Sequence, residues 1–252
     1  MKLSTKNISL IAIFAGLYYV MSLTPGPPIF GGIGSVKVIL AALAPIYGML
    51  LGPWLGALTA FIGAIIAWWL PPGTPEIFGL LMTACPLIGA LTAGGLSTIK
   101  YGRKGWLISF AVMGLLIIGW YSTWVGASAP LYPIMHVAAL IIVMVFQHRV
   151  SEMIWSENKF KRTIGVAFAS YVGVMADHMT GNLIFINALG IVIPWKVIEG
   201  WLSKMGLPDV PSLFMYLLPI SATERALMII AAIIIGTTLT TTLIKAGLIE
   251  KP

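Results

Sequence analysis

Eight apolar segments take up most of this 252-residue chain. They cover residues 8–23, 36–51, 54–70, 77–99, 106–126, 131–148, 163–193 and 223–245. A helix that crosses about 30 Å of hydrocarbon needs about 20 residues, so most of these segments approach the length of a membrane span. Only 9% of the residues are charged, against about 25% in a soluble domain. The sequence therefore predicts an all-α, polytopic transmembrane helical bundle that forms a single domain over residues 1–252.

Basic residues gather in alternate connections between these segments. With the N-terminus inside, eleven of the fifteen Lys and Arg residues fall on the inner side, at Lys2, Lys6, Lys100, Arg103, Lys104, Arg149, Lys159, Lys161, Arg162, Lys245 and Lys251. Basic residues are enriched in cytoplasmic loops. The sequence thus predicts cytoplasmic N- and C-termini in a multi-pass protein of the cell membrane. The same rule accounts for the net charge of +7, and no basic stripe with interleaved aromatics indicates a nucleic-acid partner.

The connections on the outer side are more elaborate than plain linkers. Residues 24–35 are rich in Gly and Pro, and residues 195–219 combine four aromatic side chains with scattered charges. Two interpretations remain open for these segments. They form either an interfacial helix with an aromatic belt, or a lid over an outward-facing pocket.

Three short motifs predict helix starts. Ser35 is a candidate N-cap for the second segment, and Thr74-Pro75-Glu76 resembles a cap and first turn for the fourth. Ser221-Ala222-Thr223-Glu224 has the form of a capping box. This last motif predicts that the final helix begins near residue 223.

Small residues recur at a spacing of four in two places. One series, Gly48, Gly52, Gly56, Ala60 and Ala64, runs through the second and third segments. Small residues at this spacing let helix backbones approach closely in lipid, and we interpret this series as packing inside the chain. A second pair, Ala12 and Gly16, lies on the first segment and is a candidate face for another subunit.

The sequence from Gly34 to Pro53, GSVKVILAALAPIYGMLLGP, resembles the second helix of the substrate-binding (S) components of energy-coupling factor transporters. The continuation from Gly56 to Ala64 resembles their third helix, and the likeness covers residues 8–99 best. It implies a membrane protein that captures a vitamin or similar micronutrient outside the cell. The implied partners are a coupling transmembrane subunit and two ATPase subunits. In this family an Ala-xxx-Ala face on the first helix docks to the coupling subunit, a role that falls here to Ala12 and Gly16.

The chain departs from this family in its number of spans and carries no ATP-binding signature. Family members commonly have six spans, whereas eight apolar segments are present here. Either two spans are added to a six-span core, or two of the eight segments do not span the membrane. No Gly-x-x-x-x-Gly-Lys-Ser/Thr phosphate loop occurs in the sequence. ATP hydrolysis would then belong to another chain, and no residue pattern indicates a cofactor.

Polar residues inside apolar segments are the strongest local indication of a site, because a charge at membrane depth costs at least about 2.5–3.5 kcal/mol. Asp177 lies well inside the seventh segment, and His178 and Asn182 share one helix face. We interpret this group as a solute-facing or proton-binding cluster. The alternative is a hydrogen-bond network that positions the helix.

Other candidate substrate-binding residues lie near the outer ends of segments. Lys37 either reaches to water or binds an anionic group, and Glu76 either stabilises a helix start or contacts substrate. Arg225 is a candidate partner for Glu224, Asp177 or a ligand carboxylate, and Trp124 either anchors the interface or stacks on a flat ligand ring. His136, His148 and His178 lie in different segments and do not form a recognisable metal motif.

The sequence thus favours the substrate-capture subunit of an energy-coupling factor importer, a protein that is not itself an enzyme. Its partners are a small-molecule substrate, the lipid bilayer, the coupling subunit and two ATPases. One alternative is a stand-alone proton-coupled transporter with Asp177 and His178 as the relay. A second is an intramembrane enzyme that uses the same two residues as acid and base.

Overall fold

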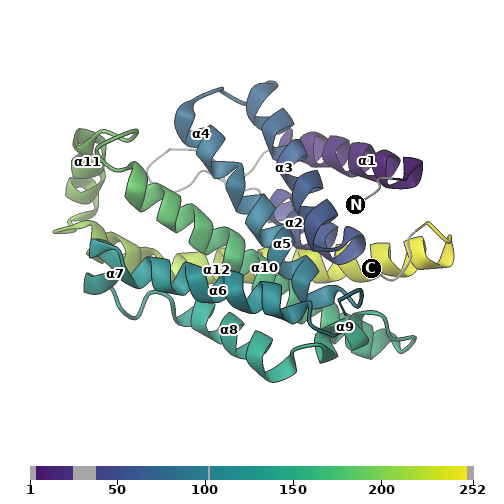
Figure 1. The fold of residues 1–252 in the computed structure, drawn as a ribbon. Coiled ribbons are helices and arrows are strands. Elements are labelled where there is room, and N and C mark those ends of the chain that lie inside the picture. The colour runs from purple at the N-terminus through teal and green to yellow at the C-terminus, as the bar shows by residue number, and fades with distance from the viewer. Residues whose placement is uncertain (1–3, 25–37, 102, 249–252) are drawn as a thin grey trace.

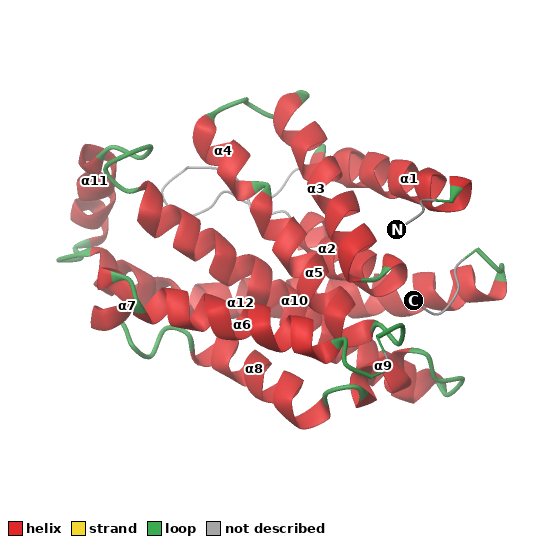
Figure 2. Ribbon diagram, in the orientation of Figure 1, coloured by secondary structure: helices red, strands yellow, loops and turns green. Residues whose placement is uncertain are grey.

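The computed structural model describes residues 4–24, 38–101 and 103–248, and these residues fold into helices (Figure 2). Within them the structure contains no β-strand, only an isolated bridge between Leu189 and Ile193. The all-α prediction is confirmed. The helices are α1 (Thr5–Ser22), α2 (Val38–Leu51), α3 (Pro53–Trp69), α4 (Ile77–Met82), α5 (Ala84–Ser97), α6 (Trp106–Tyr121), α7 (Trp124–Ser128), α8 (Ile134–Phe146), α9 (Arg149–Ile154), α10 (Lys159–Ala188), α11 (Trp195–Met205) and α12 (Val210–Lys245).

The chain runs back and forth along one axis of the molecule (Figure 1). Its passes are α1, α2, α3, α4 with α5, α6, α8, α10 and α12, one for each apolar segment of the sequence. The short helices α7 and α11 lie at one end, which we call the α11 end, and α4 lies at the top of the view, on the half of the molecule nearer to that end. Helix α9, the start of α1 and the end of α12 lie at the other, the α9 end.

Two stretches are long and apolar enough to cross a membrane by length and composition. They are Ile77–Ser97, with a mean hydropathy of 1.8, and Val210–Lys245, with a mean hydropathy of 2.2. Both point toward association with a membrane. Helices α2, α3, α6 and α8 are apolar but shorter. At 1.5 Å per residue they are only about 20–26 Å long, which falls short of the hydrocarbon thickness.

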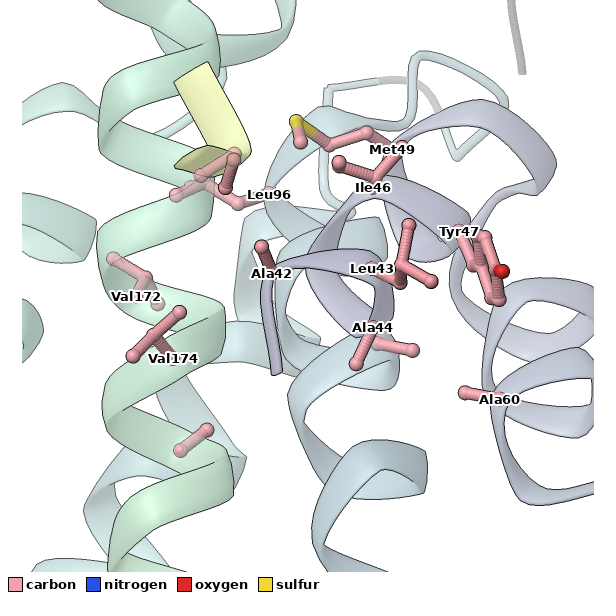
Figure 3. Packing of buried hydrophobic residues seen from close by; sticks show 14 of the residues in the cluster. Ala42, Leu43, Ala44, Ile46, Tyr47, Met49, Ala60, Leu96, Val172 and Val174 are labelled. Carbon is pink, nitrogen blue, oxygen red and sulfur yellow. The ribbon is translucent and has the colours of Figure 1, made fainter. Parts of the chain in front are cut away.

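Helix α2 is the centre of the core (Figure 3). Every residue from Ala42 to Leu51 is buried, and this helix packs against α3, α5, α10 and α12. Close packing depends on glycine: a Cβ atom placed at Gly48 would lie 2.8 Å from the backbone nitrogen of Gly94 on α5. One placed at Gly56 would lie 2.5 Å from the Cα of Gly48. The small-residue series therefore packs α2 against α3, as predicted, and against α5 as well.

Several predicted helix boundaries are wrong. Helix α12 begins at Val210, so Ser221 to Glu224 form no capping box and lie inside the helix. The cap is Asp209, whose carboxylate accepts the backbone N–H of Ser212 at 2.8 Å. The helix then continues through Pro219, which an apolar helix with tertiary packing tolerates. The outer segment 195–219 thus consists of α11 and the first ten residues of α12.

Two smaller corrections concern the other predicted caps. Glu76 is the N-cap of α4 rather than a first-turn residue, and its side chain makes no capping hydrogen bond. The fourth segment is divided at Thr83 into α4 and α5. Ser35 and most of residues 24–35 lie outside the described residues, so their predicted roles stay predictions.

Asp209 offers a test of the α12 cap. Its pKa lies below the usual carboxyl range because the side chain and backbone of Ser212 hydrogen-bond to it. Because the pKa of Asp209 is lower in the folded state than in the unfolded state, its carboxylate stabilises the fold. This stabilisation is complete above the unfolded-state pKa of about 3.9 and is lost as the pH falls through the folded-state pKa. We expect Asp209→Ala to lower the melting temperature at pH 7, and the difference to shrink at acidic pH. Thermal unfolding of the unmodified protein and the variant, at pH 7 and at acidic pH, measures this difference. Equal melting temperatures of the two proteins at pH 7 would contradict the prediction.

Candidate functional site

Asp177 lies on α10 where this helix crosses α5. A Cβ atom placed at Gly89 of α5 would lie 3.0 Å from the Cβ of Asp177, so the stem of the side chain rests against α5. Asp177 is only partly exposed. Among the described residues its carboxylate makes no hydrogen bond and no ion pair. It is therefore a carboxylate without a compensating contact, inside the helix bundle.

Arg225 faces the same region from α12. Its guanidinium forms an ion pair with Glu224 at 3.0 Å, and the two side chains are 17% and 28% exposed. Glu224 is one of the three candidate partners that the sequence offers for Arg225. Arg225 acts electrostatically on Asp177 but does not reach it as an ion pair. The positive charge of Arg225 is thus already balanced by Glu224, and the charge of Asp177 is not.

His178 and Asn182 point to another neighbour, the segment before α8. The Tyr132 hydroxyl lies 3.3 Å from Nε2 of His178 and accepts a hydrogen bond from Nδ2 of Asn182 at 3.2 Å. The His178 ring stacks on His136 of α8 with a centroid distance of 5.2 Å. The predicted cluster of Asp177, His178 and Asn182 is therefore divided between two faces of α10.

Tyr132 also belongs to a set of packed aromatic rings. It stacks on Trp120 at 4.7 Å and meets Phe214 edge-on at 5.0 Å. We call Trp120, Tyr132, His136 and His178 the histidine cluster. All four are buried, and among the described residues Nδ1 of His178 and Nε1 of Trp120 have no hydrogen-bond partner. Buried polar atoms without partners are rare, so these two atoms have hydrogen-bonding capacity that the described residues do not fill.

Glu76 lines a cavity of about 300 Å³ near the α11 end. Its walls include the aromatic side chains of Tyr18 and Trp68, and the Trp68 indole donates a hydrogen bond to the carbonyl oxygen of Glu76 at 3.0 Å. Ligand pockets typically measure about 300–1,000 Å³, so this cavity has the volume of a small ligand pocket.

The cavity and Asp177 are neighbours. Tyr18 lines the cavity and lies within electrostatic range of the Asp177 carboxylate. Met82 also lines the cavity, and its Cε lies 3.2 Å from the position of a Cβ at Gly181, one helical turn beyond Asp177. Glu76, predicted as a substrate contact, therefore lies on the same side of the molecule as Asp177.

One predicted site residue, Trp124, is not part of this arrangement. Trp124 begins α7, is 50% exposed, and lies against Trp195 with a centroid distance of 6.4 Å. Lys37 lies outside the described residues. The sequence did not single out Tyr132 and His136 as site residues. Tyr132 lies in the turn before α8 and His136 in the first turn of α8, and both rings lie near His178 of α10. His148 is the N-cap of α9 and lies away from the other two histidines. Within the described ranges no three potential metal ligands come together.

Ala12 and Gly16 are exposed on α1. A Cβ atom placed at Gly16 would meet nothing within 4 Å. Helix α1 packs on α3 through a neighbouring face, where Ala15 and Tyr18 contact the position of Gly63. The small-residue face of α1 is therefore open in this structure.

Comparison with known proteins gives one relative. An uncharacterized protein of Methanocaldococcus jannaschii is 30% identical over 180 residues, which make up 71% of this chain and 57% of the relative. The chain thus matches little more than half of that protein's length. No family model and no solved structure matches the chain.

Proposed function

We propose that this chain is a multi-pass membrane protein that captures a small solute on one side of the membrane. In this proposal it is the substrate-binding component of an energy-coupling factor importer. A coupling transmembrane subunit and two ATPase subunits complete the transporter and supply ATP hydrolysis. The observation that carries the capture role is the cavity of about 300 Å³ at the α11 end, beside the uncompensated carboxylate of Asp177.

Exposed apolar side chains along the middle of the helices support the multi-pass arrangement. Leu115 and Ile118 of α6 are 69% and 64% exposed, and Ile13 of α1 and Ile234 of α12 are each 64% exposed. Soluble monomers rarely expose contiguous apolar surface of this kind, whereas lipid tails cover it at no cost. Shorter helices such as α6 and α8 then cross as parts of a bundle in a locally thinned or adapted bilayer.

Exposed aromatic residues gather near both ends of the bundle. Trp69 and Tyr121 are the last residues of α3 and α6, Trp124 and Trp195 are the first of α7 and α11, and Tyr216 lies in the second turn of α12, whereas Trp54 and Phe160 lie at the starts of α3 and α10 and Tyr101 lies between α5 and α6. Trp and Tyr favour the two membrane–water interfaces. The two groups support a bilayer normal that follows the long axis of the helices.

Charge supports an orientation with the α9 end in the cytoplasm. The described residues of that end include nine basic side chains, at Lys6, Lys100, Arg103, Lys104, Arg149, Lys159, Lys161, Arg162 and Lys245, against two acidic ones, Glu152 and Glu157. This asymmetry follows the positive-inside rule. The cavity at the α11 end would then receive solute from outside.

Purification from the native host tests the proposal. We expect the tagged chain, extracted in mild detergent, to bring down one coupling transmembrane protein and two ATPases identified by mass spectrometry. Recovery of the chain without any ATPase, in conditions that keep a known importer of this class intact, would contradict it.

The histidine cluster favours a second candidate, a proton-coupled transporter that works alone. Stacked His136 and His178 beside an intramembrane carboxylate form the kind of group that relays protons in transporters. This candidate predicts that liposomes containing only this chain accumulate solute when a pH gradient is imposed. Accumulation only with ATP and the co-purified subunits would exclude it.

A further inference from the structure

The charges around the cavity have one sign among the described residues. Glu76 is the charged side chain of its described lining, which otherwise consists of aromatic, hydroxyl-bearing and apolar residues. The carboxylate of Asp177 lies within electrostatic range of Tyr18, and among the described residues it forms no ion pair or hydrogen bond. Arg225 does not change this balance, because it is paired with Glu224.

The whole α11 half of the molecule follows the same pattern. Its described residues include five acidic side chains, Glu76, Asp177, Glu199, Asp209 and Glu224, and three basic ones, Lys196, Lys204 and Arg225. The full chain in contrast has a net charge of +7. A cleft with one sign of charge raises the local concentration of oppositely charged ligands. Among the described residues, the α11 half therefore has an excess of negative charge, which favours cations over anions.

Aromatic side chains complete a site for a positive charge. Tyr18 and Trp68 form walls of the cavity on helices α1 and α3, and Trp68 is held in place by its hydrogen bond to Glu76. The face of an aromatic ring attracts a cation, and Trp does so most strongly. A carboxylate, a second carboxylate nearby and two aromatic rings in the lining fit a charged nitrogen better than they fit an anion or a neutral solute.

We infer that the captured solute is a small organic cation, held in this cavity by the carboxylate of Glu76, the charge of Asp177 and the rings of Tyr18 and Trp68. The inference rests on the proposed role of the cavity in solute capture. It is independent of which subunits drive transport.

Three soluble probes of nearly equal shape and different charge test the inference. Choline carries a trimethylammonium group, 3,3-dimethylbutan-1-ol replaces its nitrogen by carbon, and 3,3-dimethylbutanoate carries a negative charge. We expect choline to change the tryptophan fluorescence and raise the melting temperature of the purified full chain in a saturable way. Its half-saturation concentration is expected to be at least tenfold below that of the other two probes. An equal or stronger effect of the alcohol or the carboxylate, or no saturable effect of any probe, overturns the inference.

Variants with one charge removed locate the effect. Glu76→Gln and Asp177→Asn keep the side-chain size, and each is expected to raise the half-saturation concentration of choline at least fivefold. Glu199→Gln removes an exposed carboxylate at the same end but outside the described cavity lining, so it is expected to leave choline binding unchanged. Equal losses in all three variants would mean a general surface effect and would overturn the site. Choline binding is measured without partner subunits, so a negative binding result would not affect the co-purification test of the transporter class. A negative co-purification result would likewise not affect the binding test.

Discussion

Replacing Gly16 by leucine should abolish ATP-driven solute uptake while leaving the protein folded. Gly16 and Ala12 form an open face on α1, and nothing lies within 4 Å of a Cβ atom at Gly16. Small residues allow helices in lipid to approach closely, so a leucine here would hold a partner helix away. The substitution also raises helix propensity by about 1 kcal/mol, which argues against unfolding. Uptake in cells that contain the partner subunits, and co-purification of those subunits, measure the effect.

Gly114 supplies a matched control for this prediction. It lies in α6, and a Cβ atom there also meets nothing within 4 Å. Gly114→Leu should therefore keep uptake at the level of the unmodified protein. Normal uptake by the Gly16→Leu variant, or an equal loss in both variants, would show that the α1 face does not dock a partner. Choline binding by the purified Gly16→Leu chain should not change, since Gly16 does not line the cavity.

The helical passes were predictable from the sequence because each is a continuous apolar run. Boundaries were less predictable where the cue was local. The motif from Ser221 to Glu224 fits a capping box, yet Asp209 caps the helix twelve residues before Ser221, and α12 continues past Pro219. A capping motif adds little stability when the backbone N–H groups beside it already donate hydrogen bonds to carbonyl groups of a longer helix. Tertiary context therefore decided the start of α12.

The candidate site was predictable only in part, because its residues come from different passes. The sequence predicted Asp177, His178 and Asn182 as site residues because they are polar inside an apolar run, and Glu76 because it lies at a helix start. It does not show that Asp177 faces α5 whereas His178 and Asn182 face Tyr132. That division depends on which helices flank α10. His136 was missed for the same reason, since only the stacking of α8 on α10 brings its ring to His178.

The second large effect is expected at Gly48, where α2, α3 and α5 meet. A Cβ atom at this position would lie 2.8 Å from the nitrogen of Gly94 and 2.9 Å from the carbonyl carbon of Ala90, both backbone atoms. Backbone cannot move aside as a side chain does, and overpacking costs about 1–3 kcal/mol or more. This exceeds the gain of about 1 kcal/mol in helix propensity. Gly48→Ala should therefore lower the melting temperature by several degrees in detergent, or prevent recovery of monodisperse protein.

Gly119 separates close packing from the general effect of an added methyl group. It also lies in a helix, α6, but the nearest atom to its Cβ position is Cδ1 of Leu183 at 3.3 Å, the end of a flexible side chain. Gly119→Ala should be neutral or slightly stabilising, because Leu183 can adjust its rotamer and the helix gains propensity. Thermal unfolding and size-exclusion chromatography of the two variants make the comparison. If Gly48→Ala were as stable as Gly119→Ala, the three helices would not be in backbone contact, and the arrangement that places α5 against Asp177 would be wrong.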